Sequence, residues 1–289
     1  MHVAVMTDFG YRDPYVGIMK AVMAEYDPSL RFIDLTQGIP PFDLRSAAYI
    51  LASSWPYLPR GTVVLLVVDP GVGSARREII LEGQSKCVVA PDNGAVSLLL
   101  EQSESKLTCY RARDELLDAL RGAQPAYART FDGRDLFAPL AARIASNGAA
   151  TVTGAAAAPE KLPNLRARSV PGSGETRMEG HTVHIDTFGN VVTTITAGDL
   201  AAAGILEPAH AGSGDATLQM EVETEGGWVT LPFGGTFADV EPGGPIAYIG
   251  SAGHVEAALR EGDFAATYGV IQEKRAHVRT GRAHAGAVR

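Results

Sequence analysis

The chain has 289 residues, with 25 Lys or Arg and 33 Asp or Glu, which gives a formal net charge of −8 at pH 7. A chain of this length forms one large or two moderate domains and can bury a core without a disulfide or metal staple. Its acidic balance lacks the basic footprint of a nucleic-acid-binding protein, and its 46% hydrophobic residues exclude a largely disordered chain.

The cysteine content, the N-terminus and the short apolar runs of the sequence all predict a cytoplasmic protein. Cys87 and Cys109 are too few for a disulfide scaffold or a thiolate zinc site, and they suit a reducing compartment. The N-terminus lacks the basic and apolar regions of a signal peptide. The longest apolar run, Val63 to Val68, is too short to span a membrane. We therefore expect a cytoplasmic protein without a membrane or nucleic-acid partner.

Residues 1–160 alternate β-rich runs with segments of helical spacing, which predicts an α/β domain whose mostly parallel central sheet is flanked by helices. Asp43 is expected to cap the second helix. The predicted strands are His2–Met6, Arg31–Leu35, Thr62–Val68, Glu78–Leu81 and Cys87–Ala90, and the predicted helices are Asp13–Tyr26, Asp43–Trp55, Gly94–Glu101 and Leu136–Ala145.

The composition changes near residue 150. Residues 161–178 are rich in Pro and Gly and predict a linker. Residues 179–273 show short β-rich runs separated by Gly and Pro turns, which indicates a small antiparallel β domain. Residues 274–289 are basic, have almost no large apolar residue, and predict a disordered tail.

Polar clusters follow three predicted strands: Asp8, Asp69 with Arg76-Arg77, and Asp92-Asn93-Gly94. A fourth cluster, Asp132-Gly133-Arg134-Asp135, precedes a predicted helix. Ligands of open α/β sheets bind beyond the carboxyl ends of the strands, so these clusters predict one shared site. Each has a plainer interpretation: an Asp after a strand often caps a helix or forms a turn, Arg76 can be a surface arginine, Asp186–Asn190 can be an ordinary turn, and Phe42 and Phe237 can be core. The histidines lack metal-ligand spacing, so no metal is expected.

Taken together, segments from both domains resemble the S-adenosyl-L-methionine hydroxide adenosyltransferase family, hydrolytic relatives of fluorinating and chlorinating enzymes. The matching segments are TDFGYRDPYVGIMKAVM from Thr7, DLTQGIPPFDLRSAAYIL from Asp34, VVDPGVGSARR from Val67, APDNGAVSLLL from Ala90, TFDGRDLFAP from Thr130, HIDTFGNVVTTI from His184 and LPFGGTFADV from Leu231. The resemblance implies an N-terminal α/β domain with a seven-stranded sheet, a C-terminal β-barrel, and a homotrimer with sites between subunits.

The resemblance to this family also implies a reaction. Water attacks C5′ of S-adenosyl-L-methionine (SAM) to give adenosine and L-methionine, without a cofactor. Asp69 and Arg76 match the residues that the family uses on the water. The residues matching the family's substrate contacts are Asp8 at the ribose hydroxyls, Phe42 beside the sugar, Asn93 and Gly133 along the site, Asp186 and Asn190 at the methionine end from a neighbouring subunit, and Phe233 and Ser251 at the adenine.

One position departs from the family pattern, because the histidine of TFHGRD is Asp132 here. Asp132 could replace the imidazole as a base or water-orienting group, or it could mark weakened activity. An adenosine- or SAM-binding protein with little turnover is therefore an alternative, and halogenase-like substitution is another. Since halogenating relatives have lost the aspartate that matches Asp69, its presence favours water over halide.

Overall fold

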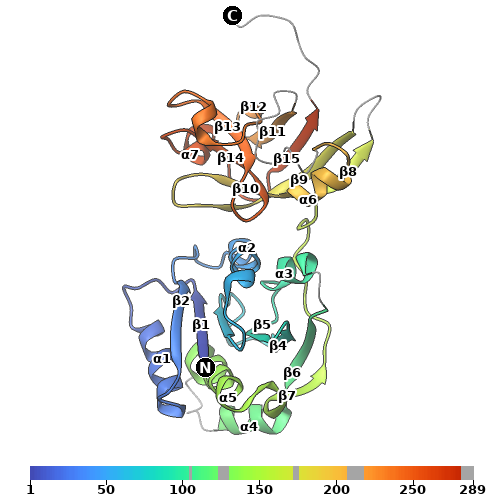
Figure 1. Cartoon of the computed structure of the whole chain (residues 1–289). Coiled ribbons are helices and arrows are strands. Elements are labelled where there is room, and N and C mark those ends of the chain that lie inside the picture. Colours follow the sequence, from blue (N-terminus) through green and yellow to red (C-terminus); the bar gives the residue numbers. More distant parts are fainter. Residues whose placement is uncertain (104–105, 123–129, 172–175, 207–217, 281–289) are drawn as a thin grey trace, which may run out of the picture. The chain divides into compact units, whose positions relative to one another are not determined.

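The computed structural model describes residues 1–103, 106–122, 130–171, 176–206 and 218–280 (Figure 1). The chain divides into two compact units, Met1–Leu162 and Pro163–Arg289. Strand β8 (Arg168–Pro171) and the start of β9 (Thr176–Ile185) lie within residues 161–178, and these two strands pair with each other. Part of the predicted linker therefore belongs to the second sheet.

Within the described residues, the first unit contains a seven-stranded sheet in the order β2-β1-β3-β5-β4-β6-β7. Its strands are β1 (His2–Thr7), β2 (Arg31–Thr36), β3 (Val63–Val67), β4 (Glu78–Gly83), β5 (Lys86–Pro91), β6 (Thr108–Ala112) and β7 (Thr153–Ala156).

The predicted α/β domain is confirmed in outline, but its sheet is mixed rather than mostly parallel. Strands β2, β1, β3 and β5 are parallel, whereas β4, β6 and β7 join through antiparallel pairs. The physical reason lies between β4 and β5, where Gln84 and Ser85 have φ values of 52° and 60°. Two consecutive left-handed residues make a tight hairpin turn, and a tight hairpin joins antiparallel strands.

Helices of the first unit pack against this sheet. They are α1 (Tyr15–Tyr26), α2 (Leu44–Ser54), α3 (Ser97–Gln102), α4 (Asp114–Gly122) and α5 (Ala138–Asn147). Apolar side chains of α1, α4 and α5 form one core with alternate residues of the central strands. Asp43 caps α2 as predicted, since its side chain accepts hydrogen bonds from the backbone N–H groups of Arg45 at 3.1 Å and Ser46 at 2.9 Å.

The second unit is an antiparallel, nearly closed barrel-like sheet, which agrees with the predicted β domain. The strand order is β12-β11-β15-β9-β10-β14-β13, with β8 paired to β9, and Phe233 bridges to Ala247 near the open edge. The remaining elements are β10 (Val191–Thr196), α6 (Ala197–Ala202), β11 (Leu218–Thr224), β12 (Gly227–Pro232), β13 (Pro245–Ile249), β14 (His254–Leu259), α7 (Phe264–Tyr268) and β15 (Arg275–Thr280).

Strand β15 corrects the prediction of a disordered tail over residues 274–289. It pairs with both β9 and β11, and Ala276 and Val278 are fully buried in the barrel core. These two small apolar residues alternate with Arg275, His277 and Arg279, which is the pattern of a strand with one buried face. Residues 281–289 of the predicted tail lie outside the described residues. Among the described residues, no helix has the length and apolar composition needed to cross a membrane.

Candidate functional site

Three residues predicted to act on the water meet beyond the end of β3. Asp69 lies two residues after this strand, and Arg76 lies near the end of the loop that follows it. Arg76 Nε donates to Asp69 Oδ1 at 3.0 Å and Oδ2 at 2.9 Å, and its Nη2 also donates to Oδ2. The same Nη2 donates to Asp132 Oδ2 at 2.5 Å. One guanidinium thus holds two carboxylates that are 63 residues apart in the chain.

These three residues, the Asp69–Arg76–Asp132 trio, are largely shielded from solvent. The exposed fractions of the side chains are 6% for Asp69, 9% for Arg76 and 27% for Asp132, so Asp132 is the member that solvent reaches most readily. Arg76 lies 4.9 Å above the ring of Phe137. Burial opposes its charge, but the hydrogen bonds and charges of Asp69 and Asp132 outweigh burial and raise the pKa of Arg76. With both carboxylates ionised, the trio carries one net negative charge.

Asn93 supports the end of β3. Its Nδ2 donates to the carbonyl oxygen of Val68 at 2.8 Å, and its Oδ1 accepts from the N–H of Ala95 at 3.2 Å. Because Val68 directly precedes Asp69, this contact fixes the backbone that carries the carboxylate. A direct contact of Asn93 with a ligand stays a prediction.

Gly133 is buried at the start of a π-helical turn, Gly133–Phe137, directly after Asp132. A Cβ atom there would lie 3.0 Å from Met19 Sδ and 3.2 Å from Phe131 Cε2. The glycine therefore lets the turn that carries Asp132 pack closely on α1. This packing explains the residue without a ligand, and its predicted role in binding stays a prediction.

Asp8 and Phe42 meet beyond the end of β1. Asp8 Oδ2 accepts a hydrogen bond from the N–H of Phe42 at 2.9 Å. Phe42 has a φ of 65°, which is a strained backbone conformation for a bulky residue, and 66% of it is exposed. The core interpretation of Phe42 is therefore wrong. Burial raises the pKa of Asp8, the Phe42 N–H opposes this, and the charge of Asp69 adds to it.

Asp186 and Asn190 form the turn between β9 and β10. Asp186 Oδ1 accepts from the N–H groups of Phe188 and Asn190, each at 2.9 Å, and Oδ2 accepts from Asn190 Nδ2 at 2.9 Å. The two side chains thus hold each other and present Phe188, which is 75% exposed, near the tip of the turn. Their predicted role as ligands of an amino acid stays a prediction.

The two remaining predicted residues also belong to the second unit. Phe233 follows β12 and is only 6% exposed, whereas Ser251 is exposed in the turn between β13 and β14. Near that turn, the structure shows a pair that the sequence analysis missed: Tyr248 Oη donates to Glu256 Oε2 at 2.7 Å. Burial raises the pKa of Glu256. The two residues face each other across β13 and β14, and finding them requires the strand register.

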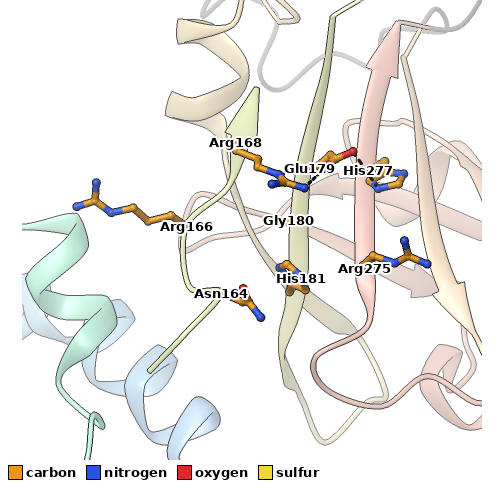
Figure 2. A pocket seen from close by; sticks show the side chains of 8 residues that line it. All are labelled: Asn164, Arg166, Arg168, Glu179, Gly180, His181, Arg275 and His277. Carbon is orange, nitrogen blue, oxygen red and sulfur yellow. Dashed lines mark hydrogen bonds and ion pairs between the residues drawn. The ribbon is translucent and has the colours of Figure 1, made fainter. Parts of the chain in front are cut away.

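A pocket of about 220 Å³ on the outer face of the second unit contains none of the predicted site residues (Figure 2). It is lined by Asn164, Arg166, Arg168, Glu179, Gly180, His181, Arg275 and His277.

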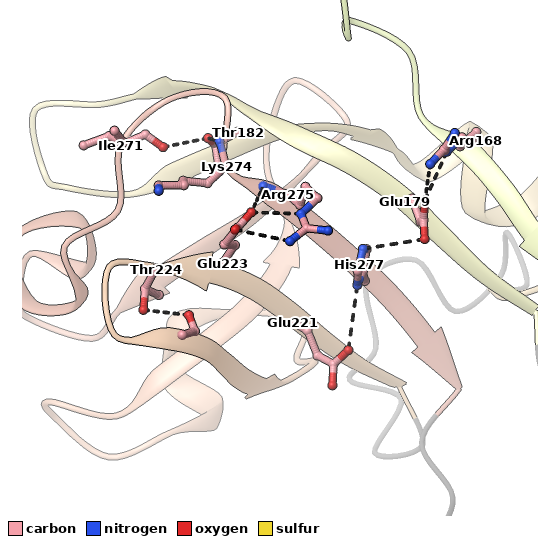
Figure 3. A network of polar contacts seen from close by, with 11 residues as sticks. Arg168, Glu179, Thr182, Glu221, Glu223, Thr224, Ile271, Lys274, Arg275 and His277 are labelled. Atoms are coloured by element: carbon pink, nitrogen blue, oxygen red, sulfur yellow. Dashed lines mark hydrogen bonds and ion pairs between the residues drawn. The ribbon is translucent and has the colours of Figure 1, made fainter.

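The charges around this pocket are paired between neighbouring strands (Figure 3). Glu179 of β9 accepts from Arg168 of β8 at 2.8 Å, and Arg275 of β15 donates to Glu223 of β11 at 3.0 Å. Glu179 also accepts from Arg177 of its own strand. Burial is the main cause that lowers the pKa of His277. We assign this cluster to cross-strand stabilisation of the barrel.

Neither metal ligands nor reactive thiols stand out in the described part of the chain. No three His, Cys, Asp or Glu side chains come together there in a way that could hold a metal ion. Cys87 and Cys109 are free and buried, and burial raises the pKa of their thiols to about 12 and about 11. The carboxylate–arginine trio is therefore the chemical centre that the geometry supports best.

Comparisons with known proteins match both units of the chain to one family. A family model described as the SAM hydroxide adenosyltransferase N-terminal domain matches residues 3–154, and one described as the C-terminal domain matches residues 180–276. The chain is 38% identical to the (R)-S-adenosyl-L-methionine hydrolase of Thermus thermophilus, over 90% of this chain and 92% of that protein. A protein of the same name from Salinispora tropica is 36% identical, over 96% and 98%.

A solved structure and more distant relatives also match the chain. A crystal structure of an uncharacterized conserved protein from Thermotoga maritima matches with a TM-score of 0.79 and 28% identity, over 97% of this chain and 100% of that one. Proteins named fluorinase match at 25% identity or less. The family matches together span both compact units.

Proposed function

Because the chain belongs to the SAM hydroxide adenosyltransferase family, we propose that it catalyses the attack of water on C5′ of SAM, giving adenosine and L-methionine. The observation that carries the proposal is the Asp69–Arg76–Asp132 trio: two carboxylates fixed by one buried guanidinium beyond the end of a parallel strand. SAM is the substrate, and we propose that the reaction needs no cofactor.

The charges of the trio suit this chemistry. In the substitution, the C5′–sulfur bond breaks, methionine leaves with the bonding electron pair, and positive charge moves from the sulfonium to the attacking water. A site with net negative charge stabilises that developing charge, and a carboxylate can accept the proton that the water loses. The reaction is balanced as SAM plus water giving adenosine, methionine and one proton.

Asp69 is the group that we propose to accept the proton. Its side chain is the most buried of the trio, and Arg76 fixes both of its oxygens. A carboxylate that is held rigidly in a dry site needs little reorganisation when charge develops next to it. Arg76 thus serves as an orienting group, and its raised pKa keeps it cationic throughout.

Asp132 takes the place of the family histidine as a second, more exposed carboxylate on Arg76. We propose that it orients the water from the side opposite Asp69. The same negative charge disfavours a halide ion, which is repelled by the two carboxylates, and so favours water as the nucleophile.

Chromatography of SAM incubated with the purified protein tests the proposal. Adenosine and methionine in equal amounts support it, whereas 5′-chloro-5′-deoxyadenosine at physiological chloride assigns the chain to halogenation. Calorimetry paired with an incubation of a day separates the third possibility, because tight binding of SAM without adenosine formation identifies a binding protein.

Asp8 is proposed to accept hydrogen bonds from both ribose hydroxyls, which requires its ionised form. We expect Asp8→Ala to raise KM about 10-fold with a smaller effect on kcat, because ribose contacts exist in the ground and transition states alike. Since burial raises the pKa of Asp8, the affinity of the wild type for adenosine should fall as the pH falls through that raised pKa. Steady-state kinetics with SAM measures the first effect, and calorimetry with adenosine over a pH series measures the second. Equal adenosine affinity of variant and wild type at every pH contradicts this role.

We also propose a cytoplasmic homotrimer in which Asp186, Asn190, Phe233 and Ser251 of one subunit complete the site of the next. The exposed aromatic rings of Phe42 and Phe188 support an assembly that covers them. The buried, free cysteines suit a reducing compartment. Light scattering should give three times the 30.4 kDa mass of the chain. A monomer with full activity at micromolar concentration contradicts the shared site.

A further inference from the structure

Two consecutive arginines at the end of the loop after β3 bind different parts of the first unit. Arg76 binds the carboxylates of the water site. Its neighbour Arg77 donates from Nη2 to Asp92 Oδ2 at 2.5 Å and to the carbonyl oxygen of Ala158 at 3.3 Å. Two adjacent residues therefore hold the loop in place: Arg76 contacts the carboxylates of the water site, and Arg77 makes a structural contact.

In the turn after β5, two adjacent side chains likewise make different contacts, one next to the water site and one structural. Asn93 supports the carbonyl of Val68, next to Asp69. Its neighbour Asp92 binds Arg77 and accepts a hydrogen bond from the N–H of Glu160 at 2.7 Å. The Asp92 side chain is only 1% exposed. A buried carboxylate needs its partners, so this ion pair has little freedom to rearrange.

The same turn and the start of α3 contact the last residues of the first unit. The N–H of Leu162 donates to Ser97 Oγ at 2.9 Å. Gly94 has a φ of 90°, and a Cβ atom on it would lie 2.8 Å from Leu162 Cγ, so only a glycine allows this approach. Segment 158–162 is thus attached to the loops that carry Arg76 and Asn93.

We propose that Arg77 and Asp92 are positioning residues for the hydrolysis: their ion pair joins the loop bearing Arg76 to segment 158–162 and so fixes the distance between Arg76 and Asp69. This inference rests on the proposed function. Residues 72–75 of the loop are exposed. The contact of Arg77 with the buried carboxylate of Asp92 therefore gives the loop a fixed end directly beside the guanidinium that orients the water.

The plain alternative is that the ion pair contributes to folding and nothing else. The two interpretations differ in which quantity changes. A purely structural pair affects the melting temperature, whereas a positioning pair affects kcat even when the protein is folded and binds adenosine normally, because a displacement of catalytic groups by about 1 Å can cost about 10²-fold in rate.

The test uses the full-length double variant Arg77→Met with Asp92→Asn. Replacing both partners leaves no buried charge unpaired, and asparagine keeps an acceptor for the N–H of Glu160. Lys20→Met is the matched control, since it removes an exposed ion pair with Asp34 elsewhere in the same unit. The measurements are kcat with SAM, the dissociation constant for adenosine, the melting temperature, and amide hydrogen exchange of segment 158–162.

We expect kcat of the double variant to fall about 10-fold or more, with adenosine affinity within about twofold and faster exchange in segment 158–162, while the control resembles the wild type. An unchanged kcat in the folded double variant overturns the proposal. So does a loss of kcat that is matched by an equal loss of adenosine affinity.

If the double variant does not fold, Arg77→Lys decides. It keeps a charge beside Asp92 but loses the planar fork that also reaches Ala158. A kcat lowered about threefold at unchanged adenosine affinity supports the proposal, and an unchanged kcat overturns it. A wild-type protein that forms no adenosine contradicts the proposed function instead, so the two failures are distinguishable.

Discussion

Asp69→Asn is expected to lower kcat by about 10²–10⁴-fold and to change KM by less than about threefold. Asparagine has nearly the same shape as aspartate but cannot take a proton from the attacking water or offset the positive charge that develops on it. The measurement is steady-state formation of adenosine, together with calorimetry for adenosine binding.

Asp34→Asn provides the matched control for this variant. Asp34 is another aspartate of the first unit, with a side chain that is 37% exposed and paired with Lys20. We expect near wild-type kinetics from it. If Asp69→Asn instead loses adenosine affinity in proportion to kcat, Asp69 supports the fold of the site and does not act on the water.

Asp132→Ala is expected to lower kcat by about 10²-fold, because Arg76 loses its second carboxylate and the water loses an acceptor. Substrate affinity should change much less, since the other proposed contacts of SAM are intact. Comparing kcat and the adenosine dissociation constant of this variant with the wild type measures the effect. A rate that equals the wild type at every pH from about 5 to 9 removes Asp132 from the mechanism.

Asp132→His restores the residue that the family pattern has at this position, and it decides how the aspartate is used. A carboxylate that is a working replacement predicts a slower histidine variant or a shifted pH optimum. A higher turnover number in Asp132→His shows instead that the aspartate weakens catalysis. The intact Gly133-Arg134-Asp135 segment and the Asp132–Arg76 contact favour the working replacement.

The gathering of Asp69, Arg76 and Asp132 could be predicted from the sequence for a physical reason. Asp69 and Arg76 lie in the loop that follows β3, and the carboxyl ends of parallel strands meet at one edge of the sheet. Asp132 instead occupies the N-cap position of the helical turn that leads into α5. The continuous Val/Leu run before Asp69 identified the central strand, and the structure shows it buried throughout. Strand-end position thus predicted the place of Asp69 and Arg76, and the resemblance to the family predicted that Asp132 joins them.

Side-chain direction within a loop could not be predicted. Arg76 and Arg77 have the same chemistry and are adjacent, yet one binds Asp69 and the other binds Asp92. The amino-acid sequence does not show which of the two side chains points into the site, because side-chain direction depends on the backbone dihedral angles of the loop. The same holds for Asp92 and Asn93: the sequence does not show that Asp92 binds Arg77 while Asn93 supports the backbone next to Asp69.

Two errors in the fold have related causes. The antiparallel β4–β5 hairpin was missed because its turn residues, Gln84 and Ser85, are not the Asn-Gly or Asp-Gly pairs that indicate such a turn. Strand β15 was missed because its charged residues dominated the interpretation, although Ala276 and Val278 alternate with them. In both cases pairing with neighbouring strands outweighs local sequence preference.

The most direct test of the central claim is the reaction of the wild-type protein with SAM in water enriched in oxygen-18, followed by mass spectrometry of the products. Attack of water on C5′ predicts adenosine with a single oxygen-18 atom in its 5′-hydroxyl group, formed in equal amount to unlabelled L-methionine. Adenosine without the label, a 5′-halogenated nucleoside, or SAM recovered unchanged after a day would contradict the account.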